Sequence, residues 1–176
     1  HKIGGLWEQF GGLYAGISDK VGPQCYGLSL RATEPGAGFD YMCAVLSTNA
    51  DQSTGGLSSF VTPKQTYAQF EHDGHVSTLH TLCRYILDDW SKQADPGINF
   101  EGGCDLIEAY AEDFDPAGTG GISVWTPLRA ALAAVETTIS RSVWRNPFLS
   151  KGGPIFFGRK LERVMRFELT TPSMAS

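Results

Sequence analysis

A carboxylate in the middle of an apolar β-strand is the feature that most constrains this chain. Residues 104–115 read Cys-Asp-Leu-Ile-Glu-Ala-Tyr-Ala-Glu-Asp-Phe-Asp. Alternate side chains of a strand point to the same face, so Glu108 shares a face with Leu106 and Tyr110, while Ile107 and Ala109 share the other. If the face of Glu108 is buried, its ionised carboxylate requires a positive partner.

Few Lys or Arg residues lie near Glu108 in the sequence to act as that positive partner. A bound cation in a pocket lined by aromatic side chains would supply the charge. The alternative is that Glu108 faces solvent and that Tyr110 is half exposed. The periodicity of the strand leaves both interpretations open.

The periodicity of the rest of the chain indicates a mixture of helices and strands. Helical spacing occurs over residues 3–14 and 76–90. Extended segments are predicted over 24–30, 39–46, 57–61, 65–71, 105–112 and 122–128. The order helix, strand, strand occurs twice, which suggests an internal repeat. In the second copy strand 65–71 precedes the helix, and in the first copy an equivalent strand would lie before His1.

Charge is distributed unevenly along the chain. Residues 1–128 contain 6 Lys/Arg and 16 Asp/Glu, a balance of −10, whereas residues 129–176 contain 8 and 3, a balance of +5. An acidic body attracts cations and is a poor surface for nucleic acid, so we expect no direct nucleic-acid binding. We expect two parts, 1–128 and a basic extension over 129–176.

Several other functional classes find no support in the sequence. No apolar stretch is long enough for a membrane helix, and no signal peptide is visible, although the chain opens at His1 rather than Met. The cysteines form no C-x-x-C pair, which favours reduced thiols in a cytoplasmic protein. His72 and His75 straddle a strand-to-helix break without an H-E-x-x-H motif, and no nucleophile elbow or phosphate loop occurs. We therefore expect no metal, no cofactor and no catalytic residue.

A set of short motifs resembles the GyrI-like effector-binding family over about residues 3–128. That family includes the drug-binding domains of AraC-type and MerR-type multidrug regulators and stand-alone versions. Among its members the chain is most similar to cationic-drug-binding proteins encoded on integron gene cassettes. The motifs are Leu6-Trp7-Glu8-Gln9-Phe10, Tyr26-Gly27, Gly38-Phe39-Asp40-Tyr41, Thr66-Tyr67-Ala68-Gln69-Phe70, His72-Asp73-Gly74, Asp89-Trp90, Ile107-Glu108-Ala109-Tyr110 and Val124-Trp125-Thr126-Pro127.

The resemblance implies an α+β fold of two pseudo-symmetric β-α-β-β halves, with antiparallel sheets and two main helices around a central ligand cleft. It implies that Glu108 reaches into the cleft and neutralises a hydrophobic cationic ligand. The candidate aromatic walls are Trp7, Phe10, Tyr41, Tyr67, Tyr110 and Trp125. The first strand of the family pattern is missing, so we expect the tail or a second subunit to cover that sheet edge.

Two other functions stay open at this stage. Some relatives in the family are hydrolases that use pocket carboxylates as acid and base, and a buried glutamate suits that role. No second pocket acid can be assigned in this sequence. The family name also suggests a protein-interaction module that restrains an enzyme such as gyrase.

Residues 129–176 match no part of the family pattern. Apolar residues spaced near 3.5 predict an amphipathic helix over about 128–144. Beyond it we expect either a loosely structured extension or a segment that covers a sheet edge. A homodimer could form through that edge or through helix 128–144.

Overall fold

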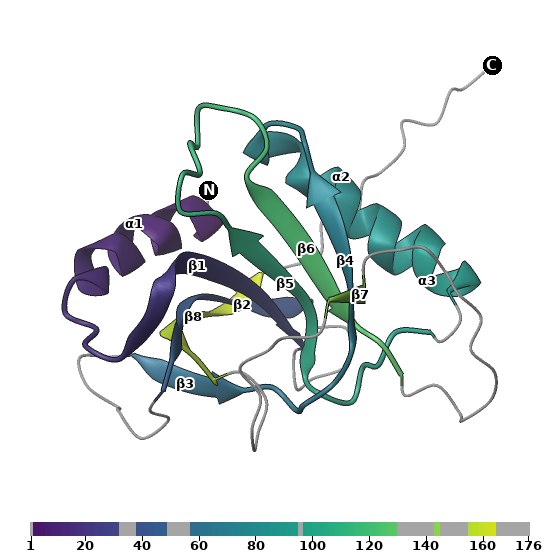
Figure 1. The fold of residues 1–176 in the computed structure, drawn as a ribbon, viewed down its shortest axis with the longest axis horizontal. Coiled ribbons are helices and arrows are strands. Elements are labelled where there is room, and N and C mark those ends of the chain that lie inside the picture. Colours follow the sequence, from purple (N-terminus) through teal and green to yellow (C-terminus); the bar gives the residue numbers. More distant parts are fainter. Residues whose placement is uncertain are drawn as a thin grey trace.

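One antiparallel sheet forms the body of the molecule. The structure is a computed structural model that describes residues 2–31, 38–48, 57–94, 97–129, 143–144 and 155–164. Its eight strands follow the order β3-β8-β2-β1-β5-β6-β4-β7, and every neighbouring pair is antiparallel (Figure 1). The strands are β1 (Lys20–Arg31), β2 (Phe39–Ser47), β3 (Ser58–Val61), β4 (Tyr67–His72), β5 (Cys104–Tyr110), β6 (Ile122–Pro127), β7 (Val143–Trp144) and β8 (Ile155–Val164).

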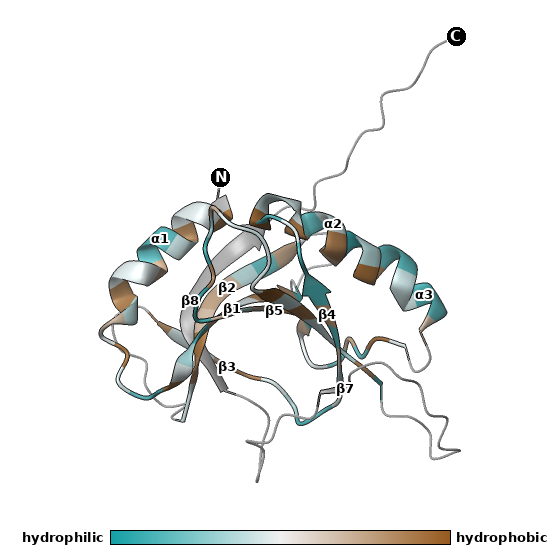
Figure 2. Ribbon diagram, turned by 45° about the horizontal axis from the view of Figure 1, so that its top comes forward, coloured by the Kyte–Doolittle hydropathy of each residue, from teal (hydrophilic) through white to brown (hydrophobic). Residues whose placement is uncertain are grey.

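Two helical segments cover the same face of the sheet. The first is α1 (Lys2–Tyr14), which buries Leu6 and Phe10 despite its four glycines. The second runs without a break through η1 (Val76–Thr78), α2 (Leu79–Arg84), η2 (Tyr85–Trp90) and α3 (Ser91–Gln93). The η2 turn is a π-helix, a form that usually occurs as a single turn inside an α-helix. Figure 2 shows α1 over one half of the sheet and α2 over the other.

The expected α+β fold is confirmed, and its two halves meet at the centre of the sheet. In the second half β4 pairs with β6 and β6 with β5, while in the first half β2 pairs with β1. The halves join where β1 pairs with β5, with Tyr26 opposite Ala109 and Gly27 opposite Glu108. Strand β1 starts earlier than expected, at Lys20, because a register irregularity after Lys20 accommodates Gly22 (φ 75°) and Pro23 within the strand.

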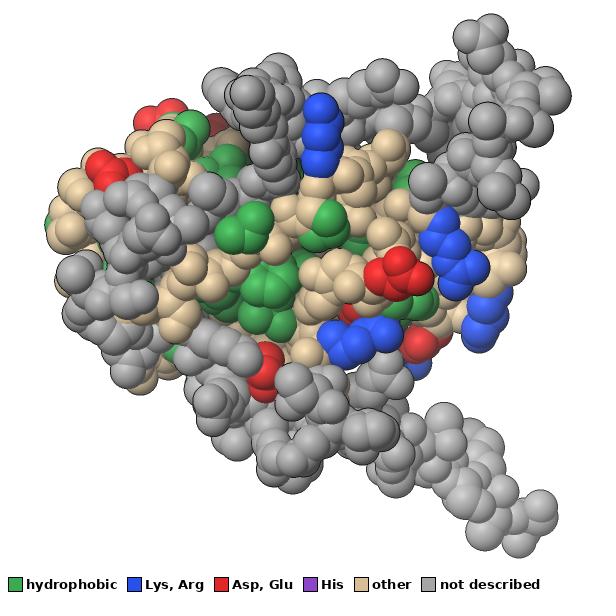
Figure 3. Space-filling model, turned by 90° about the horizontal axis from the view of Figure 1, so that it is seen from below, with side chains coloured by type: hydrophobic (Ala, Val, Ile, Leu, Met, Phe, Trp, Pro, Cys, Tyr) green, Lys and Arg blue, Asp and Glu red, His purple; other side chains and the backbone are tan. Residues whose placement is uncertain are grey.

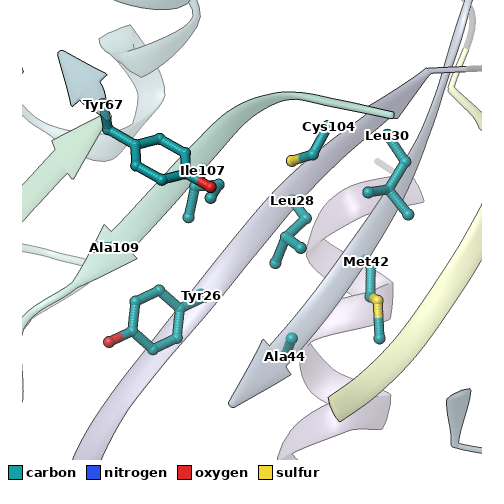
Figure 4. Packing of buried hydrophobic residues seen from close by; sticks show 9 residues of the cluster. All are labelled: Tyr26, Leu28, Leu30, Met42, Ala44, Tyr67, Cys104, Ile107 and Ala109. Atoms are coloured by element: carbon teal, nitrogen blue, oxygen red, sulfur yellow. The ribbon is translucent and has the colours of Figure 1, made fainter. Parts of the chain in front are cut away.

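The sheet is apolar on both faces. The helix side holds two buried clusters, one under α1 around Phe10 and Tyr41 and one under α2 around Ile86 and Tyr110. The opposite face holds a third cluster, which includes Tyr26, Leu28 and Ile107. Figure 4 shows how the residues of this third cluster line up along neighbouring strands. Seen from below, hydrophobic side chains gather near the middle of the surface, and charged side chains lie beside them (Figure 3).

Two parts of the basic extension belong to the same sheet. Strand β7 pairs with β4 at one edge, and β8 lies between β2 and β3 near the other. Of the two expectations for the tail, residues 155–164 therefore follow the second, because they cover the edge of β2. The predicted helix over 128–144 is wrong at both of its ends. Leu128 forms a β-bridge with Ile98, and residues 143–144 form β7. Residues 130–142, on which the rest of that prediction depends, lie outside the described residues.

Candidate ligand-binding site

Glu108 lies at the middle of the sheet on the helix side, and two tyrosines bind its carboxylate. Its exposed fraction is only 9%. The Tyr110 hydroxyl donates to Oε2 over 2.7 Å, and the Tyr41 hydroxyl donates to the same oxygen. Tyr41 lies on β2, across β1 from Glu108, and Tyr110 lies on β5, the strand of Glu108 itself. The buried alternative for Glu108 is the one that this structure shows.

Gly27 makes room for this arrangement. It lies on β1 directly between Cys43 of β2 and Glu108 of β5. A Cβ atom at position 27 would collide with the Tyr41 ring and would lie 2.6 Å from Oε2 of Glu108. Glycine in the interior of a strand often marks a close approach of another group. Here it lets Tyr41 reach across β1 to the carboxylate.

Aromatic rings from α1 and from the segment after β5 lie around the pair of tyrosines. Trp7 packs edge-on to Tyr110 with ring centroids 5.0 Å apart, and edge-on to Phe10 at 5.9 Å. Phe114 packs against Tyr110 from the other side, also at 5.0 Å. Trp7 contacts both helix-side clusters and is only half-buried, whereas Phe10 is almost completely buried. These rings therefore lie on the helix side of the sheet, in the region where the resemblance implies a ligand cleft.

The environment of Glu108 favours its neutral form, but two hydrogen bonds oppose that effect. Burial raises the pKa of the Glu108 carboxyl, and the hydrogen bonds from Tyr41 and Tyr110 lower it. Burial, together with the nearby carboxylate, also raises the pKa of both tyrosines. Cys83 of α2 is close enough for Glu108 to contribute to its thiol pKa, which burial raises to about 12. Both tyrosines therefore stay protonated as donors, and no neighbouring thiol competes as an anion.

Among the residues whose side chains the structure describes, no cation pairs with Glu108. Arg31 pairs with Asp105 at 3.0 Å and Arg84 with Asp88 at 3.9 Å, and in this part of the chain no ion pair reaches Glu108. No cluster of three or more His, Cys, Asp or Glu side chains that could hold a metal ion occurs within the described ranges. Within the part of the chain whose side chains are described, this carboxylate has no opposite charge, and a cationic ligand would supply one.

Tyr67 and Trp125 lie on the other face of the sheet and not beside Glu108. Tyr67 belongs to the cluster that contains Ile107 and Ala109, whose side chains point away from the helices. Trp125 packs on the same cluster, with its ring 6.5 Å from Tyr67 and 6.0 Å from Tyr26. Successive residues of a strand point to opposite faces of the sheet. The motif resemblance alone could not show to which face Tyr67 and Trp125 point. Of the predicted site residues, the structure brings together Glu108, Trp7, Phe10, Tyr41 and Tyr110.

A separate hollow of about 540 Å3 opens elsewhere on the surface. Its lining includes Lys64, Gln65, Asn99 and Glu101 together with Pro63 and Leu128. Glu108 is not part of it. The buried acid and its aromatic neighbours are the stronger candidate, because a ligand site for an organic molecule combines apolar walls with a few converging polar groups.

Sequence reasoning missed three contributors to the site. They are Gly27, Cys43 and Cys83, of which Cys43 is fully buried beside Tyr41 in the cluster under α1. Gly27 could have been found, because a lone glycine within an apolar strand signals close approach. The two cysteines carry no such signal, since a cysteine in an apolar segment most often fills the core.

Comparisons with known proteins identify the family. The model of the GyrI-like small molecule binding domain matches residues 1–129. Neither the comparison with curated proteins nor the comparison with solved structures returned a match. Within the described residues, no helix is both long and apolar enough to cross a membrane. The match covers most of the chain, including Glu108 and all the residues around it, and the chain belongs to the GyrI-like small-molecule binding domain family.

Proposed function

We propose that this GyrI-like domain binds hydrophobic organic cations and that Glu108 provides the opposite charge. The observation that supports this most is that Glu108, with an exposed fraction of only 9%, has no cationic partner among the residues whose side chains the structure describes. Leaving such a charge unpaired is costly, so a cationic ligand gains more here than at the surface.

The orientation of the carboxylate supports the same ligand class. Both tyrosine hydroxyls donate to Oε2, so Oε1 has no donor among the described residues. Because both hydrogen bonds go to Oε2, a cation that binds at Oε1 would not compete with either of them. Trp7 supplies a partly exposed aromatic ring next to this group, and cations bind such faces with about 0.5–2 kcal/mol.

We further propose a stand-alone sensing or sequestering role, in the manner of the effector domains of AraC-type regulators and of the integron-cassette proteins that the sequence resembles. All four cysteines are free thiols, which supports a reducing, cytoplasmic location. Hydrolysis is the less supported function, because the groups that contact Glu108 are two phenols and not a second carboxylate.

Titration with a matched pair of ligands tests the proposal. Methyltriphenylphosphonium and triphenylphosphine oxide have similar size and shape, but only the first is charged. We expect wild type to prefer the cation and Glu108→Gln to weaken cation binding about 10- to 100-fold, since opposite unit charges about 6 Å apart attract by roughly 3 kcal/mol at an effective dielectric of about 20. The affinity for the oxide should change little.

Glu112→Gln is the matched control, since it removes the same charge from an exposed position just beyond β5. It should leave both affinities unchanged. An equal loss of both ligands in Glu108→Gln would contradict the charge role. Turnover of either an ester or an epoxide that disappears in Glu108→Gln would favour the hydrolase instead.

A further inference from the structure

Strand β8 occupies the place in the first half that β4 occupies in the second. In the second half the outward order is β5, β6, β4, and β4 is antiparallel to β6. In the first half the outward order is β1, β2, β8, and β8 is antiparallel to β2. A segment from the far end of the sequence therefore completes the first half (Figure 1).

Strand β2 has the character of an interior strand. Its residues Met42, Cys43, Ala44 and Val45 are each at most 1% exposed, so it is buried on both faces. None of the residues 41–46 is charged. Natural edge strands are protected by charges, prolines or bulges. Strand β2 has none of these over 41–46, so its outer backbone groups require a neighbouring strand.

Strand β8 also connects β3 to the rest of the sheet. Ser58–Val61 pairs with residues 155–158, and in the described part of the chain β3 has no other strand neighbour. Phe157 pairs with Val45 on one side and with Ser59 on the other. The backbone of β8 is thus flanked on both sides in this region, and β2 and β3 both depend on it.

Charge favours the same pairing. The segment 155–164 carries three basic residues and one acidic residue, whereas residues 1–128 have a balance of −10. Oppositely charged surfaces attract at long range and speed association, and salt screens that attraction.

We propose that the outer edge of β2 is a strand-acceptor site, and that its occupant is the segment 155–164, exchangeable between copies of the chain. The site is filled in cis in this structure, and the same segment of a second copy can replace it. Recognition is by backbone hydrogen bonds, as in other cases where an extended segment adds to a sheet edge.

Hydrogen exchange on the full chain tests whether β8 protects β2. In Phe157→Pro the substituted residue has no backbone N–H and fits poorly in a strand that has neighbours on both sides. We expect exchange over 39–47 and 58–61 to become at least about tenfold faster, while 104–110 stays protected. Ser173→Pro, beyond β8, should leave all these segments unchanged. Unaltered protection of 39–47 in Phe157→Pro would overturn the proposal.

A labelled peptide with the sequence of 155–164 tests exchange in trans. It should bind Phe157→Pro more tightly than wild type, where the resident strand competes, and should restore protection over 39–47. The same peptide with proline at the position of Phe157 should not bind. Equal binding to both proteins, or binding without restored protection, would overturn the proposal.

A third measurement on wild type covers the case in which Phe157→Pro does not fold, which loss of protection over 104–110 would reveal. Excess peptide should then accelerate exchange of the protein's own residues 155–164 while 39–47 stays protected. If the peptide leaves exchange over 155–164 unchanged, the segment is not exchangeable and the proposal fails.

Discussion

The two faces of the sheet both bury tyrosines, but they use the hydroxyl groups differently. On the helix side, Tyr41 and Tyr110 donate to the carboxylate of Glu108. On the opposite face, Tyr26 donates to the side-chain oxygen of Gln24 at 2.9 Å, and Tyr67 accepts from the Gln65 amide at 3.1 Å. One face thus directs its tyrosines toward a buried charge, and the other toward neutral amides.

This difference shows why aromatic content alone does not identify a ligand site. Tyr26, Tyr67 and Trp125 also form an aromatic group, in which the Trp125 ring lies 6.0 Å from Tyr26 and 6.5 Å from Tyr67, whereas Trp7 and Phe114 each lie 5.0 Å from Tyr110. Gln24 and Gln65, which hydrogen-bond the hydroxyls of Tyr26 and Tyr67, are neutral amides. Among the side chains that the structure describes, Glu108 is the buried charged group that lies beside aromatic rings, and the comparison can be tested by substituting matched residues on the two faces.

The largest effect should come from filling the space at Gly27. In Gly27→Ala the new methyl group would overlap the Tyr41 ring and lie 2.6 Å from Oε2 of Glu108. Overpacking of this kind costs about 1–3 kcal/mol, and the hydrogen bond of Tyr41 should also be lost. We expect a lower midpoint of urea unfolding and loss of cation binding.

Gly11→Ala is the control for that substitution. Gly11 is exposed in α1, and an added Cβ would have no atom within 4 Å. Alanine there should raise the free energy of unfolding by up to about 1 kcal/mol. A Gly27→Ala protein as stable as wild type would show that the close approach of Tyr41 to Glu108 is not required.

The next effect compares one hydroxyl on each face. Tyr41→Phe removes a donor to a charged group, which contributes about 1.5–3 kcal/mol, whereas Tyr26→Phe removes a donor to a neutral amide, which contributes about 0.5–1.5 kcal/mol. Both tyrosines are at most 2% exposed, so the loss of burial is matched. Urea unfolding at pH 7 should show the larger loss in Tyr41→Phe, and equal losses would remove the distinction between the faces.

A smaller effect is expected when the tryptophans of the two faces are compared by ligand affinity. Trp7→Leu should weaken binding of methyltriphenylphosphonium about 2- to 30-fold, because a cation–π contact contributes about 0.5–2 kcal/mol. Trp125→Leu should leave this affinity unchanged, since Trp125 packs on the cluster on the far face. Calorimetric titration measures both, and a weaker affinity in Trp125→Leu alone would place the ligand on the wrong face for this proposal.

Local sequence patterns predicted the elements and placed Glu108 on one face with Leu106 and Tyr110, but they left its burial open. The alternation Leu106, Glu108, Tyr110 is a property of neighbours in one strand, so the sequence contains it directly. The faces of Tyr67 and Trp125 depend on how β4 and β6 pair, and the position of β8 depends on a pairing with β2 across more than 100 residues. Such long-range pairings leave no periodicity in the segments that form them, which is why residues 155–164 could be read as either an extension or an edge strand.

The smallest expected effect is the pH dependence that Glu108 adds to stability, because the two tyrosine hydrogen bonds offset part of the effect of burial. The folded-state pKa of Glu108 is raised above its ordinary value of 4.5. As the pH rises from about 4.5, the unfolded chain loses this proton before the folded chain does, so the unfolded state binds fewer protons and the free energy of unfolding falls. The decrease ends once the pH exceeds the folded-state pKa. Glu108→Gln should remove this decrease, whereas Tyr41→Phe should extend it to higher pH, because it removes a hydrogen bond that lowers the pKa. Urea unfolding of the three proteins between pH 4 and 8 measures the difference, and parallel curves for wild type and Glu108→Gln would show that this carboxyl titrates as it does in the unfolded chain.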